Sequence, residues 1–257
     1  MVTETTPSSY APRLNHRTRD RGPDASLFNG TKPMGLVFPS HVHACLANDQ
    51  VVFLDERADT YSALSPDLLS PFKRLLAGTA TDEDAEAVAG PLLPTGLLTR
   101  TAATGDRLAL ANIDRPTVGR ADEPTRLTFS SDLVKALFAR WEWSFRAQWQ
   151  RPDGYFPVLR RKKANLIRRL KTSPPLEAAV AHAKPMLDTR WLLPTHDKCL
   201  PWSMAMTRYL MNRDIPVDLI IGVKTKPFGA HAWVQYRGTV LSDVFDEVRP
   251  FTPIVLI

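Results

Sequence analysis

Residues 198–243 read KCLPWSMAMTRYLMNRDIPVDLIIGVKTKPFGAHAWVQYRGTVLSD, and this stretch decides how the C-terminal part of the chain folds. Its first third has apolar residues at helical spacing, so we expect an amphipathic helix whose first turn holds Cys199. The segments DLIIGV, HAWVQY and TVLSDV have the composition and alternation of strands. Cys199, His231 and Asp243 therefore fall on one predicted helix and two adjacent predicted strands.

These three residue types suit a cysteine nucleophile. A helix N-terminus and a nearby imidazole stabilise a thiolate, and a carboxylate orients the imidazole. Pro201 suits a first helical turn, and residues 195–197 are of capping type, which favours a helix that starts near Cys199. A backbone N–H beside Cys199 could also stabilise an oxyanion. The alternatives are a cysteine buried as a small apolar residue, a locally satisfied strand histidine and a turn carboxylate.

The register of the last hairpin bears on this interpretation. A three-residue loop over 236–238 would set His231 directly opposite Asp243, whereas a two-residue turn at 237–238 would send Asp243 to the other face. Gly238 at the third loop position suits a type I turn followed by a G1 bulge. We therefore expect the three-residue loop and a shared face for the histidine and the acid.

Composition limits the class of protein. The chain has 257 residues and only two cysteines, Cys45 and Cys199, so no disulfide framework is indicated. The polar N-terminus has no apolar signal region, and no apolar run reaches the ~18–20 residues of a membrane span. We expect a cytoplasmic, reduced protein with no membrane association. His41 and His43 alternate near Cys45 but lack further ligands, so no metal site is expected.

The net charge of +6 is concentrated in one segment. Residues 151–171 carry eight Lys or Arg and a single Asp. Such a run is most often a solvated helix face, and binding of an acidic peptide, a nucleotide or nucleic acid is the alternative. No zinc-finger, RNP or Walker motif supports a nucleic-acid partner.

Two folded units are expected. Residues 1–33 are polar and predicted to be disordered. Residues 34–100 read as three short strands followed by a helix over 65–78, capped by Ser65 and ended by Gly78, and a second helix from Thr81. These are the proportions of a small winged-helix-like α+β module. Residues 101–124 carry little periodicity and are taken as a linker in which LALANI could add an edge strand.

The second unit, residues 125–257, is predicted to have its helices first and an antiparallel sheet last. Helices are expected over 130–150, 159–171 and 175–187, before the helix of Cys199. The first of them has an aromatic cluster that we expect in the core rather than in a ligand site: Trp141, Trp143, Phe145 and Trp149.

The C-terminal stretch resembles the transglutaminase-like cysteine peptidase domain of lasso peptide maturation B proteins. The resemblance rests on C-L-P with a helix after it, R-x-I-P, the strand L-I-I-G-V, P-F-x-A-H-A-W-V and the downstream Asp. It extends over about 190–257 and implies an α+β, papain-like peptidase domain. It also implies a catalytic triad of Cys199, His231 and Asp243.

The first unit resembles the PqqD-like RiPP recognition element, through the strand pattern and the motif L-D-x-R-x-x-x-Y in VVFLDERADTYSALSPDLLSPFKRLL. In that family a leader peptide adds as a strand to the module's sheet and packs on its last helix, a β-augmentation. The resemblance implies that the facing helical segment is roughly 88–98. The implied leader-binding residues are Thr60, Tyr61, Ser62, Ala63, Leu64, Leu93 and Leu97.

Together the two resemblances imply a leader peptidase for a lasso peptide precursor. They also imply a partnership with an asparagine-synthetase-like cyclase and ATP dependence of the joint reaction. Because the chain has no nucleotide motif, we expect no cofactor bound directly and ATP chemistry in the partner. Two alternatives remain open: a transglutaminase-type acyl transferase with the same three residues, and a non-catalytic chaperone that binds the precursor.

Overall fold

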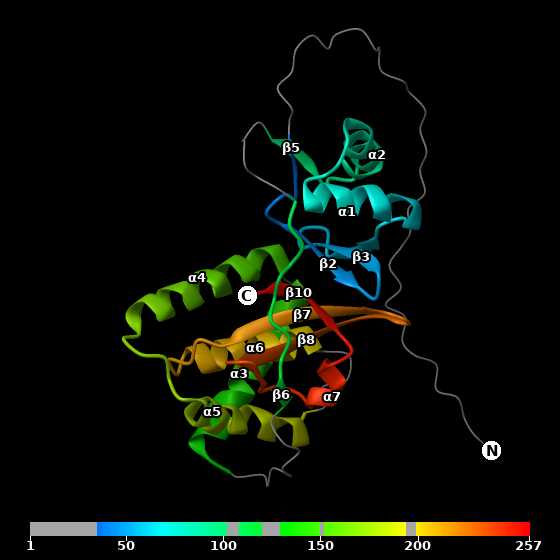
Figure 1. The fold of residues 1–257 in the computed structure, drawn as a ribbon. Coiled ribbons are helices and arrows are strands. Elements are labelled where there is room, and N and C mark those ends of the chain that lie inside the picture. Colours follow the sequence, from blue (N-terminus) through cyan, green and yellow to red (C-terminus); the bar gives the residue numbers. More distant parts are fainter. Residues whose placement is uncertain (1–34, 102–107, 120–128, 150–151, 194–198) are drawn as a thin grey trace, which may run out of the picture.

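A computed structural model describes residues 35–101, 108–119, 129–149, 152–193 and 199–257. The predicted disordered extension over 1–33 lies outside these residues. The described chain forms a small N-terminal module that sits on a larger C-terminal domain of mixed helix and sheet (Figure 1).

The N-terminal module is built on a three-stranded antiparallel meander. Its strands are β2 (Val42–Ala47), β3 (Gln50–Asp55) and β4 (Thr60–Ala63), in the spatial order β2-β3-β4. These are the three short strands predicted for the module, with a turn at 56–59 between β3 and β4. A further pair, β1 (Gly35–Val37) and β5 (Thr99–Thr101), closes the module by joining its two ends.

Helices cover one face of this meander. A short 3-10 turn, η1 (Pro66–Leu68), leads into α1 (Leu69–Ala77), which stops at Gly78 because that residue adopts the left-handed conformation. Helix α2 (Asp82–Leu92) starts with a capping box between Thr81 and Asp84. Phe53 of β3 and Phe72 of α1 meet edge to face in the core between these layers, with ring centroids 6.0 Å apart.

The C-terminal domain contains a five-stranded sheet in the order β10-β7-β8-β9-β6. The central strands are β7 (Asp218–Thr225) and β8 (Phe228–Tyr236), followed by the two-residue β9 (Thr239–Val240). Two strands were not predicted. One is β10 (Thr252–Leu256), which follows α7 (Phe245–Val248), and the other is β6 (Val118–Gly119). The latter comes from the predicted linker and pairs with β9 in parallel, whereas LALANI forms no strand.

The helices of this domain precede its central strands, as predicted. They are α3 (Ser131–Trp149), α4 (Pro152–Arg169), α5 (Leu176–Asp188) with the 3-10 turn η2 (Thr189–Trp191), and α6 (Cys199–Met211). Helix α6 packs along β8, where the Ser203 hydroxyl donates to the carbonyl oxygen of Ala232 over 2.8 Å. Within the described parts of the chain, none of the helices has the length and apolarity that crossing a membrane requires.

The aromatic prediction for α3 was partly wrong. Trp143 is buried, with 4% of its surface exposed, but Trp141 and Phe145 are 63% and 57% exposed. The buried face instead carries Leu133, Ala136 and Arg140 together with Trp143. Helical spacing predicted that one row of side chains along α3 is buried. Because α3 packs against α5 and α6, the neighbouring row is buried instead.

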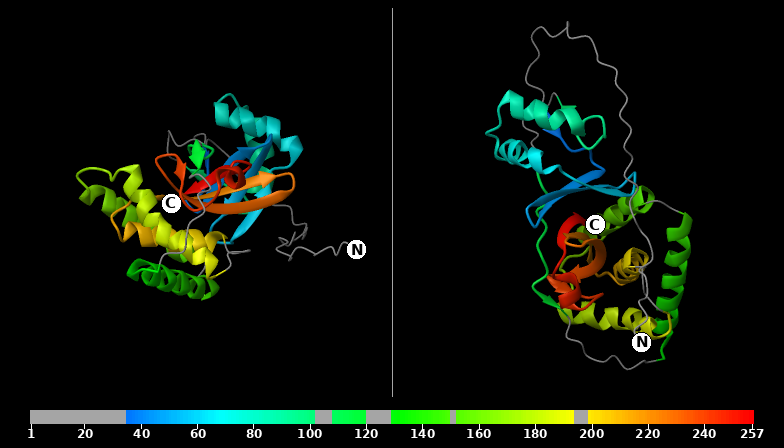
Figure 2. Two further views of the ribbon diagram at one scale, coloured as in Figure 1. Left: turned by 90° about the horizontal axis from the view of Figure 1, so that it is seen from below. Right: turned by 90° about the vertical axis from the view of Figure 1, so that its right-hand side faces the viewer.

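The two units share one interface. The second face of the meander, with Cys45, Val52 and Leu54, belongs to the same buried core as the C-terminal domain. Figure 2 shows β2 and β3 lying between the module's helices and the C-terminal strands. The backbone N–H of Ala111, in the connecting segment, donates to the carbonyl oxygen of Ala44 over 2.7 Å. Both faces of β2 and β3 are therefore covered.

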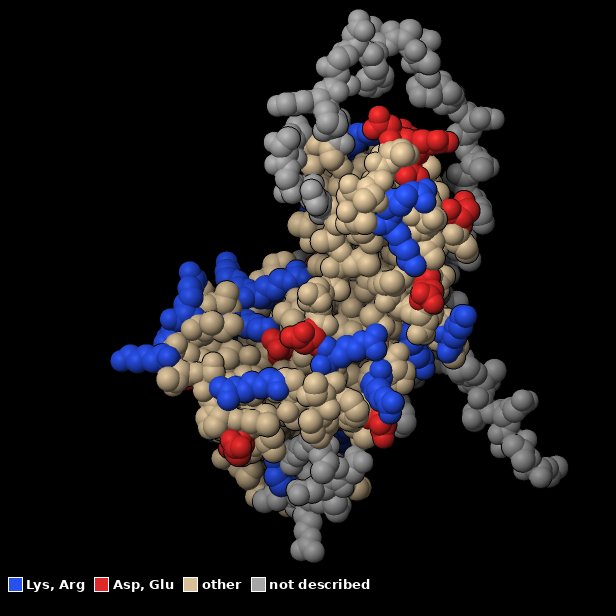
Figure 3. All heavy atoms as spheres, in the orientation of Figure 1, with Lys and Arg blue, Asp and Glu red and all other residues tan. Residues whose placement is uncertain are grey.

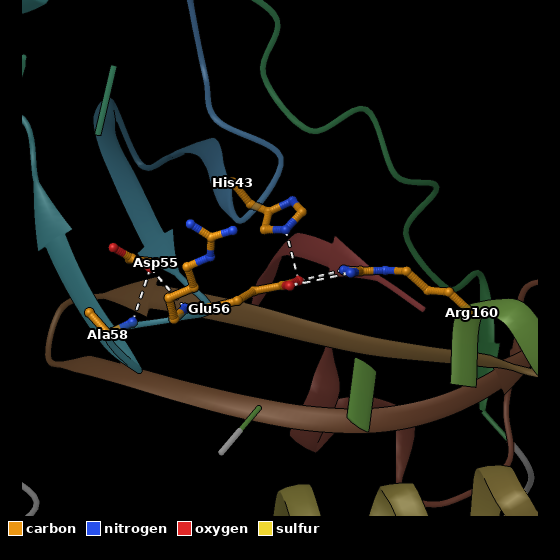
Figure 4. A network of polar contacts seen from close by, with 6 residues as sticks. His43, Asp55, Glu56, Ala58 and Arg160 are labelled. Atoms are coloured by element: carbon orange, nitrogen blue, oxygen red, sulfur yellow. Dashed lines mark hydrogen bonds and ion pairs between the residues drawn. The ribbon is translucent and has the colours of Figure 1, made fainter. Parts of the chain in front are cut away.

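A buried carboxylate fastens this interface. Glu56, at the end of β3, accepts from His43 Nε2 over 2.8 Å and from both terminal nitrogens of Arg160 on α4 (Figure 4). Burial raises the pKa of Glu56, but the hydrogen bonds from His43 and Arg160 lower it more, so it lies below its ordinary value. The side chain is 4% exposed and ionised, which makes it an ionic bridge between the domains.

The basic run forms much of α4, and its cations gather at the left of Figure 3. Several of them reach across to acidic partners: Arg160 to Glu56, Lys163 to Asp218 and Arg169 to Asp214. These contacts dock α4 on the rest of the molecule, so the run is not simply a solvated face.

Candidate active site

Cys199 is the first residue of α6, and its sulfur lies near the backbone N–H of Ala232 on β8. Among the described residues, β9 pairs with β8 only at Gln235 and Tyr236, so it does not extend to Ala232. Burial raises the pKa of the thiol, but the His231 side chain and the backbone N–H groups of Ala232 and Leu200 lower it more. The pKa of Cys199 therefore lies below its ordinary value. The unpaired N–H groups of a helix N-terminus and a neighbouring imidazole are the groups that favour a thiolate.

His231 lies on β8, opposite Gly222 of β7. Its imidazole stacks near Trp233 and lies 5.4 Å from the ring of Phe251, measured between centroids. Burial lowers the pKa of His231, but Asp243 and Cys199 raise it more, and the result is about 9. The imidazole is therefore protonated at neutral pH and held between an acid and the thiol.

Asp243 reaches His231 by a route that the sequence did not predict. The three-residue loop was wrong: Tyr236 pairs with Thr239 across a two-residue turn. Arg237 and Gly238 have φ of 50° and 76°, and positive φ at both central residues is typical of a type I′ turn. In a continuous ladder this register would turn Asp243 away from the histidine.

The ladder, however, ends after Val240. Residues 241–243 bend, and the Ser242 hydroxyl accepts from the backbone N–H of Val234 over 2.8 Å in place of a main-chain partner. This bend brings Asp243 Oδ2 to 3.6 Å from His231 Nε2, the distance of an ion pair. Asp243 thus belongs to a bend rather than to the predicted strand. The acid and the histidine nevertheless meet.

Two further groups hold the acid. Arg190 of η2 donates from Nη2 to Asp243 Oδ1 over 2.7 Å, and the Ser242 hydroxyl donates to Oδ2 over 2.6 Å. Burial raises the pKa of Asp243, whereas His231, Arg190 and Ser242 lower it more. The pKa therefore lies below its ordinary value, and the carboxyl is ionised at neutral pH. Its side chain is only 5% exposed.

Arg190 was missed by sequence reasoning. It lies 53 residues before Asp243 and has no motif around it. Its guanidinium also lies over the ring of Trp202 on α6, 5.3 Å from the centroid, with Arg140 at 5.0 Å from the same ring. Trp202 is buried in this stack, with 3% of its surface exposed. The stack connects α3, η2 and α6 behind the acid.

The predicted leader-binding residues are divided between surface and core. Thr60, Ser62 and Ala63 are exposed on β4, while Tyr61 is half-buried. Leu64, one residue past β4, and Leu97 are buried, and Leu93 packs partly against the same core. Among the residues that the structure describes, no three metal-binding side chains gather to hold an ion.

The arrangement joins a low-pKa thiol, a protonated imidazole and an ionised acid in one chain of contacts. Such a set can generate a thiolate nucleophile and supply a proton to a leaving group. Cys45, the other cysteine, is the opposite case: burial raises its pKa to about 12, against a weaker opposing effect of Arg115. Both cysteines are free thiols.

Comparisons with known proteins found two similarities. Residues 139–256 match the model of the Transglutaminase-like superfamily. The Microcin J25-processing protein McjB of Escherichia coli is 47% identical over 45 residues, an alignment that covers 18% of this chain and 22% of that protein. The chain thus matches little more than a fifth of the relative's length. No solved structure matches the chain significantly. Cys199, His231 and Asp243 all lie within the transglutaminase-like part of this α+β chain.

Proposed function

We propose that this protein is a cysteine peptidase that removes the leader from a lasso peptide precursor. The observation that carries the proposal is the contact of Cys199, His231 and Asp243, with a lowered pKa at the thiol and a raised pKa at the imidazole. The local similarity to a protein whose name describes microcin processing supports the substrate class.

In the acylation step the Cys199 thiolate attacks the carbonyl carbon of the bond between leader and core. The C–N bond breaks, and the imidazolium of His231 donates its proton to the departing amine. Nε2 faces Asp243, which leaves Nδ1 for the sulfur and the leaving group. Asp243 fixes this orientation and offsets the positive charge of the ring.

In the deacylation step His231, now neutral, takes a proton from water, and the resulting hydroxide attacks the thioester. The products are a leader carboxylate and the regenerated thiolate–imidazolium pair. The released core begins with a free amine, which is the nucleophile that a cyclase joins to a side-chain carboxyl. We therefore propose an asparagine-synthetase-like cyclase as partner, with ATP consumed in its activation step.

The N-terminal module supplies substrate capture in this proposal. A leader held on the edge of β4 raises the effective concentration of the scissile bond at the domain that bears Cys199. The packing of the small sheet on the C-terminal core supports this role, because it keeps the module against the domain that bears Cys199.

The test is incubation of the full chain with a precursor encoded beside it, with and without the cyclase and ATP, and mass analysis of the products. We expect free leader and core from the wild type and none from Cys199→Ala. Cys45→Ala is the matched control, because its thiol is buried and stays protonated. Leader release by Cys199→Ala at the wild-type rate would contradict the proposal and favour a chaperone.

Acyl transfer is the second candidate, and the match to the Transglutaminase-like superfamily favours it. The same thioester would then pass to an amine rather than to water. The masses of the products distinguish the two reactions, since hydrolysis leaves a carboxylate on the leader and transfer leaves an amide.

A further inference from the structure

The outer edge of β4 carries main-chain groups that no strand in the described part of the chain pairs with. Leu64 donates its backbone N–H to the carbonyl oxygen of Val51, back toward β3. Because such groups alternate between the two sides of a strand, the N–H and C=O of Tyr61 and Ala63 point to the free edge. A peptide added beside β4 would pair with these two residues.

The side chain of Tyr61 faces the C-terminal domain instead. Tyr61 lies opposite Leu54 of β3, and both pack on the C-terminal core, where Cys199 also packs. Its ring meets Phe228 of β8 edge to face, with centroids 5.7 Å apart. Burial raises the pKa of the phenol, and the charges of Asp59 and Cys199 raise it further, so it stays neutral.

The direction of an added peptide fits this placement. The module's sheet is antiparallel throughout, and a peptide that continues this order runs from beside Ala63 toward Thr60. Its C-terminal end then leaves the sheet at Tyr61. The bond between leader and core lies C-terminal to the bound leader segment, so the peptide to be cleaved leaves the sheet at Tyr61, whose ring contacts Phe228 of the C-terminal domain.

We propose that Tyr61 is a positioning residue that joins the leader-binding edge to the site of Cys199. Its main chain holds the leader, and its ring, braced by Phe228, guides the emerging peptide toward the sulfur. The inference rests on the proposed leader peptidase function. Without the ring, the scissile bond samples more positions relative to the thiolate, and the loss of near-attack geometry slows the chemical step.

The test is steady-state cleavage of a full precursor by the full chain. We expect Tyr61→Ala to lower kcat about tenfold with a change in KM of less than about threefold, because orientation rather than capture is lost. Tyr61→Phe keeps the ring and should retain kcat within about twofold. If Tyr61→Ala does not fold, Phe228→Ala replaces it, since Phe228 is 48% exposed; a kcat lowered about threefold is then expected.

Thr225→Val is the matched control. It removes the hydroxyl that accepts from Asn48 across the same interface and keeps both rings in the protein. Equal loss in Thr225→Val would assign the effect to loose docking and overturn the inference, as would an unchanged kcat in Tyr61→Ala or a change in KM alone. Absence of cleavage by the wild type would overturn the peptidase proposal and this inference with it. Wild-type cleavage with an unaffected Tyr61→Ala would overturn this inference alone.

Discussion

Replacing Asp243 by Asn tests how the imidazole acquires its charge. Burial lowers the pKa of His231, yet Asp243 and Cys199 raise it from 6.5 to about 9. One pKa unit corresponds to about 1.4 kcal/mol, so the imidazolium is stabilised by about 3 kcal/mol overall. Asn keeps the shape of Asp243 and can still accept from Arg190, but it carries no charge. We therefore expect the pKa of His231 to fall by more than about one unit.

The assay is the pH dependence of Cys199 alkylation by iodoacetamide, measured in a Cys45→Ala background. The rate follows the thiolate, so the wild type should show one step below the ordinary thiol pKa and a second near pH 9. These two steps belong to the thiol–imidazole pair rather than to either group alone. In Asp243→Asn the upper step should move to lower pH, because the imidazolium loses the negative charge that stabilises it.

The control is Asp246→Asn, which removes an exposed acid three residues away on α7. It should leave both steps where they are in the wild type. An upper step in Asp243→Asn within about 0.3 pH unit of the wild type would refute the claim that Asp243 charges the imidazole.

Three further predictions concern the support of the site. Arg190→Gln removes a contact that lowers the pKa of Asp243, so the acid limb of the activity–pH profile should move to higher pH; an unmoved limb would contradict this. Glu56→Gln should lower the free energy of unfolding in urea by about 2 kcal/mol. Because the pKa of Glu56 is depressed, this contribution is present above its ordinary pKa and lost as the pH falls through the folded value; an equal loss at every acid pH would count against it. Gly222→Ala would put a Cβ 2.7 Å from the ring of Trp233 beside the histidine, so we expect destabilisation of about 1–3 kcal/mol and reduced activity; a fully stable, active variant would show that the strand can shift.

Local sequence signals predicted the elements of the N-terminal module well. Alternation marked the strands, and the residues around Thr81 and Gly78 marked a helix start and a helix end that the structure confirms. These signals depend only on residues that are close in sequence, so they can be recognised without knowledge of the tertiary structure. The capping box at Thr81 is of this kind.

The hairpin register depended on contacts that are distant in sequence. The turn at 237–238 is held by Thr117, which donates to the carbonyl oxygen of Gly238, and by Ser173, which accepts from Arg237. Neither partner is near the hairpin in sequence, so turn chemistry alone left two registers open. The bend that delivers Asp243 depends likewise on Ser242 and its bond to β8.

The remaining differences also concern tertiary choices. The aromatic residues of α3 formed two possible stripes, and only packing against α5 and α6 selected that of Trp143 over that of Trp141. Arg190 carries no local pattern that separates it from other surface arginines. Its partner Asp243 is 53 positions away, and a single sequence gives no indication that the two residues meet.

The most direct test of the central claim uses a leader peptide that ends in a chloromethyl ketone. The Cys199 thiolate should displace chloride and form a thioether to the methylene carbon, and intact-mass and peptide analysis would locate the adduct. We predict one equivalent of leader on Cys199, formed faster than with a scrambled leader and abolished in Cys199→Ala. Modification of Cys45, or labelling that does not depend on the leader sequence, would contradict a leader-directed cysteine nucleophile.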